Sequence, residues 1–281
     1  MTITRLGKIA HGQDGAIFGT ELFRMDEKGH CTVYELGGDA PVETGKFTLD
    51  RADEIAPRSN AVCFGAERYA EKDPYPLLYT NIYNNYAGAE NKHIGECLVY
   101  RIQKTKEGFA STLVQIIAIG FFEDAALWKA SPEGHGVRPY ANFLVETDTG
   151  SYYAYVMRDE ARGTRCFRFD LPSVHHGEID PVLGVRRVVL MPEDIRARFD
   201  LPFFRFIQGG IIEGGILYST EGFSHSEVNV PAIRAVSLKT GEETYYRLPD
   251  YGVYEEPEMI DFLDGVCYYS DAAGVLYRVD F

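Results

Sequence analysis

The chain has little tryptophan, no cluster of positive charge and no long apolar run. Its 281 residues contain one tryptophan, and 28 Lys and Arg stand against 42 Asp and Glu. The formal net charge of -14 repels a phosphate backbone or an anionic lipid surface, and no local Lys/Arg cluster offsets it. We therefore expect neither nucleic acid nor a membrane as a partner.

Other signals are also absent. No stretch has the roughly 18 apolar residues of a membrane span, and the first residues lack the apolar segment of a signal peptide. These two absences predict a cytoplasmic protein. The five cysteines are odd in number and widely spaced, without a CxxC pair, so buried thiols are expected and a zinc or redox site is not. A phosphate loop and a Gly-x-Ser-x-Gly nucleophile elbow are missing.

What the sequence does contain is an internal repeat. A polar residue precedes a short apolar run and a turn signal at five places, namely Gln13, Asn60, Asn142, Gln208 and Glu258. Further segments rich in strand-forming residues follow each run. Repeated units have to stack, because one unit alone cannot bury a core. The repeat therefore predicts an all-β fold in which residues 1–281 form a single five-bladed β-propeller domain.

The ends of the chain are expected to close the ring. Fourth strands are predicted over 46–49, 113–117, 186–190 and 244–248, whereas the fifth unit ends after three. Residues 2–9 have no partner of their own, so we predict that this N-terminal strand joins the last blade and leaves no open edge. Helical insertions are predicted near 122–129 and over 192–199.

A six-bladed ring is the alternative, because the long second unit has room for another blade over 120–137. That stretch has no alternation of polar and apolar residues, which favours five blades.

The polar residues that begin the five units are expected at one mouth of the central channel, because the first strand of each blade is innermost. Polar groups that converge on a rigid frame can bind a small polar ligand, and the neighbouring loops rich in tyrosine and amides suit a carbohydrate. The alternative is that these side chains satisfy backbone groups and channel water. The expected ligand-binding residues are Gln13, Asn60, Tyr83, Asn84, Tyr140, Asn142, Arg158, Gln208 and Glu221.

Two carboxyls are expected at the same mouth, Asp14 beside Gln13 and Glu258 in the closing unit. Such a pair can serve as general acid and base. Several five-bladed propellers are glycoside-active enzymes with three acidic residues on inner strands, and this chain resembles them in that respect only, since Glu146 falls late in its strand. If the protein is an enzyme, the resemblance implies hydrolysis of a glycoside with Asp14 and Glu258 as catalytic residues.

Oxygen-bearing side chains at the mouth would also suit a calcium ion in the channel, although no calcium-loop motif is present. No other cofactor is expected.

Residues 206–222 (FIQGGIIEGGILYSTEG) and the turn Leu-Lys-Thr-Gly at 238–241 resemble one blade of the plant-type glutaminyl cyclotransferases, which are also five-bladed propellers. The resemblance supports the fold, and it points to Gln208 and Glu221 if it extends to a site. The competing function is that of a non-catalytic scaffold, in which an outer face or a loop rim engages another protein.

Overall fold

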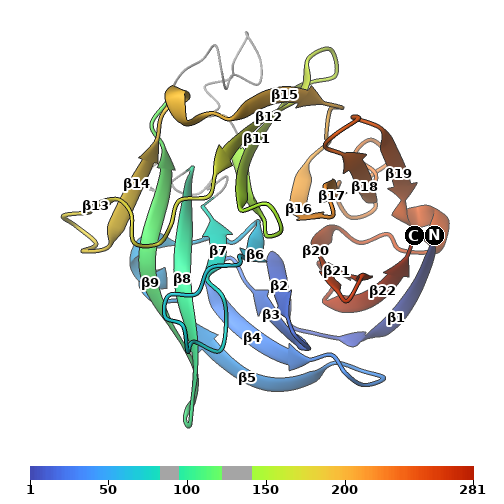
Figure 1. Cartoon of the computed structure of the whole chain (residues 1–281). Coiled ribbons are helices and arrows are strands. Elements are labelled where there is room, and N and C mark those ends of the chain that lie inside the picture. Colours follow the sequence, from blue (N-terminus) through green and yellow to red (C-terminus); the bar gives the residue numbers. More distant parts are fainter. Residues whose placement is uncertain (83–94, 122–140) are drawn as a thin grey trace.

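Five β-sheets stand around a central axis in the computed structural model, which describes residues 1–82, 95–121 and 141–281 (Figure 1). The innermost strand of each sheet contacts the innermost strands of its two neighbours, so the ring is complete. These inner strands are β2 (Asp14–Phe18), β6 (Val62–Phe64), β10 (Ala141–Glu146), β16 (Ile207–Glu213) and β20 (Pro257–Leu263). The predicted five-bladed propeller is confirmed.

Blades 1 and 4 are four-stranded antiparallel sheets. Blade 1 continues through β3 (Glu21–Met25), β4 (His30–Glu35) and β5 (Val42–Thr48). Blade 4 continues through β17 (Ile216–Glu221), β18 (Ala232–Ser237) and β19 (Glu243–Arg247). Gly214 and Gly215 join β16 to β17 with φ of 56° and 75°, which is the left-handed backbone that a tight hairpin requires.

Blade 5 closes the ring with the start of the chain. It contains β20, β21 (Val266–Asp271), β22 (Val275–Asp280) and, on the outside, β1 (Thr2–Lys8). β1 is antiparallel to β22, with Thr2 opposite Asp280, so the two ends of the chain lie side by side (Figure 1). The predicted closure by the N-terminal strand is confirmed.

Blade 2 has six strands, two of which come from a later part of the sequence. In spatial order they are β6, β7 (Leu78–Asn81), β8 (Glu96–Thr105), β9 (Gly108–Ile119), β14 (Arg186–Leu190) and β13 (Glu178–Ile179). The prediction that 186–190 completes the third unit is therefore wrong, because β14 pairs in parallel with β9 of blade 2. Arg187 links β14 to this sheet, since it binds Glu96 of β8, and it also pairs with Asp180 of its own hairpin at 2.8 Å.

Blade 3 consists of β10, β11 (Ser151–Asp159), β12 (Gly163–Asp170) and β15 (Ala197–Leu201). β15 begins inside the stretch 192–199 for which a helix was predicted, and that prediction is wrong, because the stretch holds only the short 3-10 helix η1 (Pro192–Asp194) before the strand. The helix predicted over 122–129 lies outside the described residues. The other short helices are α1 (Ala52–Ile55) and the 3-10 turn η2 (Leu248–Tyr251).

The hydrophobic core lies between neighbouring blades. On β3, Phe23 packs toward blade 2, with its ring centroid 5.2 Å from that of Phe64, whereas the preceding Leu22 packs with Met259 of blade 5. Both faces of β3 are thus buried, which explains why its sequence is a nearly continuous apolar run interrupted by Arg24. All five cysteines are buried and free, as expected. Among the described residues, no helix is long and apolar enough to span a membrane.

Candidate functional site

Three blades place a polar residue at the same position of one channel mouth. In β16 and β20 the register shifts after the first residue, so Gln208 and Glu258 have no residue opposite them. Such a β-bulge turns a side chain out of the regular ladder. Gln13 takes the matching place in blade 1, directly before β2, where its backbone N–H donates to the carbonyl of Met25 at 2.8 Å.

Hydrogen bonds connect the residues of this mouth. Asn60 Nδ2 donates to Gln13 Oε1 at 3.1 Å, and Gln208 Nε2 donates to a carboxylate oxygen of Glu256. The structure thus brings Gln13, Asn60, Gln208 and Glu258 to one end of the channel. Asn142 lies in β10 opposite Tyr155. Tyr83, Asn84 and Tyr140 lie outside the described residues.

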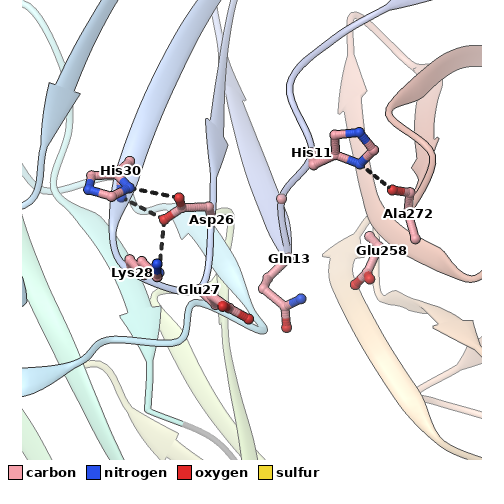
Figure 2. Close-up of a pocket in the computed structure, with 9 residues that line it drawn as sticks. His11, Gln13, Asp26, Glu27, Lys28, His30, Glu258 and Ala272 are labelled. Atoms are coloured by element: carbon pink, nitrogen blue, oxygen red, sulfur yellow. Dashed lines mark hydrogen bonds and ion pairs between the residues drawn. The ribbon is translucent and has the colours of Figure 1, made fainter.

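A pocket of about 370 Å³ opens at this mouth, at the seam between blades 1 and 5 (Figure 2). This seam pocket is lined by His11, Gly12, Gln13, Asp26, Glu27, Lys28, His30, Glu258 and Ala272. Figure 2 shows Gln13 between Glu27 of the β3–β4 turn and Glu258 of β20. The rim is held by two contacts, from His11 Nδ1 to the Ala272 carbonyl at 2.7 Å and from His30 Nδ1 to Asp26 at 2.8 Å.

Behind the seam pocket lie buried polar groups that have no hydrogen-bond partner among the described residues. Asp14 Oδ2 accepts the N–H of Val62 at 2.8 Å, but Asp14 Oδ1 accepts nothing. Arg24 donates from Nη2 to the Gly12 carbonyl at 2.7 Å, whereas its Nε and Nη1 are unpaired. Glu258 Oε2 is also unpaired, and the residue is only 5% exposed. Native proteins pair most buried polar groups, so this cluster is the candidate site.

The electrostatics of the cluster follow from burial. Burial raises the pKa of the Asp14 and Glu258 carboxyls well above their usual range, and the nearby Arg24 opposes the shift in both. Burial lowers the pKa of Arg24, while Glu258 and Asp14 act against that change. A carboxyl with a raised pKa can remain protonated near neutral pH and donate a hydrogen bond or a proton.

Three other acidic or basic residues singled out from the sequence have their own partners away from the seam pocket. Glu221 is fully buried and binds Arg234 Nε at 2.6 Å, the backbone N–H of Arg205 at 2.9 Å and Ser219 Oγ at 3.1 Å. Arg158 pairs with Asp200 on the outermost strand of blade 3 at 2.8 Å. Glu146 ends β10, where it accepts a hydrogen bond from Tyr153 at 3.1 Å.

Sequence reasoning missed Arg24 and Thr220. Thr220 is fully buried on β17, and its Oγ1 is unpaired. Arg24 interrupts the apolar run Leu-Phe-Arg-Met of β3, and a charged residue at a core position was the available signal.

Among the described residues, no group of three or more His, Cys, Asp or Glu side chains is arranged to hold a metal ion.

No family model and no curated protein matches the sequence. Solved structures match over the whole chain. Glutaminyl cyclase from Myxococcus xanthus is 10% identical with a TM-score of 0.51, and the match covers 100% of this chain and 94% of that one. Virginiamycin B lyase from Staphylococcus aureus is 10% identical with a TM-score of 0.44, covering 99% and 98%, and Sqt1 from Saccharomyces cerevisiae is 6% identical with a TM-score of 0.41, covering 100% and 98%. The similarity to the cyclase shows a shared fold.

Proposed function

We propose that the protein binds a small, polar, carbohydrate-like molecule in the seam pocket. The observation that carries this proposal is Glu258 Oε2, an unpaired oxygen on a nearly buried side chain that lines the pocket. This oxygen is closed to solvent in the structure, so a ligand hydroxyl would give it the partner that the protein does not supply only after a small shift of the Glu258 side chain toward the pocket.

The other lining groups suit a molecule that both donates and accepts hydrogen bonds. Gln13 offers an amide, Lys28 an ammonium group and Glu27 a carboxylate. Hydroxyl groups of a sugar can serve all three. The mixture of charges on the lining favours a neutral polyol over a strongly anionic ligand, which the two glutamates would repel.

Cleavage of the ligand is the enzymatic form of this proposal. Glu258 lines the pocket and would be the proton donor, because burial raises the pKa of its carboxyl. Asp14 would be the second carboxyl, and its free Oδ1 is the atom available for that role. A pair of carboxyls on adjacent blades is the minimum that glycoside hydrolysis requires.

Calorimetric titration with a panel of mono- and disaccharides tests the binding, and a glutaminyl peptide belongs in the panel because the Myxococcus xanthus protein is a glutaminyl cyclase. We expect at least one sugar to bind, and Glu258→Gln to weaken its binding by roughly tenfold or more, since an amide in place of the carboxyl leaves the hydrogen-bonding group of the sugar mismatched. The exposed Glu193→Gln is the matched control and should bind normally. Release of 4-nitrophenol from aryl glycosides, absent in Glu258→Gln, would establish cleavage. A panel without any binder contradicts the proposal.

The second candidate function, an interaction scaffold, is favoured by an exposed apolar surface on blade 2. Ile179, Val182, Val189 and Met191 are 59%, 82%, 47% and 39% exposed on or beside the β13–β14 hairpin. Exposed apolar side chains gathered at one place mark interaction surfaces. Light scattering over a concentration series, with Val189→Glu as the variant, tests whether this surface drives association. If wild type and variant are both monomeric at every concentration, self-association through this hairpin is ruled out.

A further inference from the structure

A second set of oxygen atoms surrounds Gly209, on the inner strand of blade 4. A Cβ atom built on Gly209 would lie 2.4 Å from the carbonyl oxygen of Glu258, 3.2 Å from Thr220 Oγ1 and 3.3 Å from Asp14 Oδ1. These oxygens belong to blades 5, 4 and 1. Three blades thus bring oxygens close together beside Gly209, where a Cβ atom would collide with the Glu258 carbonyl, so only glycine fits.

Two of these oxygens are buried and lack a hydrogen-bond partner in the described structure. Asp14 and Thr220 are both 0% exposed, and Asp14 Oδ1 and Thr220 Oγ1 are unpaired. The carboxylate of Glu258 adds an unpaired Oε2 from the same residue that supplies the carbonyl. Unpaired buried oxygens cost folding free energy, so an arrangement of this kind calls for an occupant.

Charge indicates which occupant fits. Three buried carboxyls, Asp14, Glu258 and Asp271, act on the single buried guanidinium of Arg24, and Arg58 acts on Glu258 from the partly exposed rim. The oxygens of Asp271 are already used, by the N–H of Val275 at 2.9 Å and the hydroxyl of Tyr277 at 3.0 Å. Water would pair the free oxygens, and protonation, which burial favours, would turn one carboxyl oxygen into a donor. A cation pairs several of the free oxygens at once and also offsets the charge of a carboxylate.

We propose that the channel binds one compact, oxygen-coordinated cation between Asp14 Oδ1, Thr220 Oγ1 and the carbonyl and carboxylate oxygens of Glu258. All of these donors are hard oxygens, without imidazole or thiolate, so Ca²⁺ is the metal ion that suits them. The same oxygens could accept the primary ammonium group of an organic ligand. The site needs a hydroxyl and a carbonyl beside its two carboxyls, so it differs from a cage of acidic side chains. It does not depend on a sugar in the seam pocket.

The test is titration of chelator-treated, full-length protein with CaCl₂, followed by calorimetry and by the shift in Tm. MgCl₂, KCl and methylammonium chloride run in parallel. We expect saturable binding of one cation per chain and a rise in Tm with at least one of these salts. Binding of Ca²⁺ or another metal ion identifies a metal site, and binding of methylammonium alone identifies the ammonium group of a ligand. If none of the four binds, the proposal is overturned.

Variants locate the cation at these atoms. Asp14→Asn keeps an oxygen for the Val62 N–H but removes the charge, and we expect cation affinity to fall at least tenfold. Thr220→Val keeps the shape and removes the hydroxyl, so it should also weaken binding, whereas Thr220→Ser keeps the hydroxyl and should retain it.

The outcomes separate this proposal from the seam-pocket proposal. Cation binding that is unchanged in Asp14→Asn and Thr220→Val would place the ion elsewhere and overturn the inference. If Asp14→Asn does not fold, the Thr220→Val and Thr220→Ser pair decides. A sugar that binds in chelator, in a protein that binds no cation, would leave the seam-pocket proposal standing and remove this one.

Discussion

Single buried carboxyls join neighbouring blades in this ring. Asp261 Oδ2 accepts the N–H of Ile17 from the next blade at 2.6 Å, as Asp14 Oδ2 accepts that of Val62 at 2.8 Å. In Asp261 the second oxygen accepts the N–H of Phe262 at 2.7 Å. In Asp14 the N–H of the following Gly15 also lowers the pKa of the carboxyl, but Oδ1 has no well-formed hydrogen bond. The two carboxyls thus share one structural device, and Asp14 is the less completely paired of them.

The pH dependence of folding should show the cost of burying Asp261. Burial raises the pKa of its carboxyl from 3.8 to about 7, so between these values the folded state holds a proton that the unfolded state releases. The stability contributed by this group is therefore present below about pH 4 and is lost as pH rises toward about 7, at up to ~1.4 kcal/mol per pH unit. Asp261→Asn should consequently be less destabilised, relative to wild type, at about pH 8 than at about pH 5. Urea unfolding at both pH values measures this, and an equal difference at the two would contradict it.

At the scale of strands, the sequence predicts that a strand exists better than it predicts which sheet the strand joins. The Val-rich run 186–190 is a strand, as expected, but its parallel pairing with β9 depends on contacts made far away in the sequence. The ion pair of Arg187 with Glu96 of β8 is one such contact, and no local pattern reports it. The same limit applies to the candidate site. The repeat located Gln13, Gln208 and Glu258 because each lies at the start of an inner strand. The lack of partners for Nε and Nη1 of Arg24 depends on how blades 1 and 5 meet, which the sequence pattern does not report.

Arg187 is expected to hold the β13–β14 hairpin against blade 2. Arg187→Gln removes a cation that binds two carboxylates, one from β8 and one from the β13–β14 turn. We expect faster amide hydrogen exchange across β13 and β14, with a loss of roughly 1–3 kcal/mol in the local opening free energy and little change in the inner strands. Arg186→Gln is the control, because Arg186 donates only to the Gly177 carbonyl, at 2.9 Å. Similar exchange in the two variants would show that the ion pairs are not what holds the hairpin.

For the molecule as a whole, the pairing of β1 with β22 closes the ring beside the seam that carries the candidate site. Blades 1 and 5 meet at the seam pocket, and their inner strands β2 and β20 are in contact. Antiparallel pairing joins the two ends of the chain, and a hydrogen bond from Lys8 Nζ to the Ala273 carbonyl at 2.8 Å adds to it. Opening of the ring at β1 would therefore separate the elements that carry Gln13 and Glu258, so stability and binding are expected to change together.

A covalent link across this closure tests the connection between closing and binding. Thr4 and Arg278 are exposed and lie opposite each other on β1 and β22, and the double variant Thr4→Cys, Arg278→Cys places two thiols across the pair. The disulfide would enclose nearly the whole chain, and the loss of unfolded-state entropy should stabilise the oxidised form by up to roughly 5 kcal/mol. Urea unfolding of the oxidised and reduced forms measures the gain, and the reduced form of the same variant is the control.

Ligand affinity at the seam pocket should be equal or higher in the oxidised form, because the bound geometry is held in place. A clear gain in stability accompanied by weaker binding would mean that the ligand enters only when this seam opens, and the closed seam pocket would then not be the binding geometry.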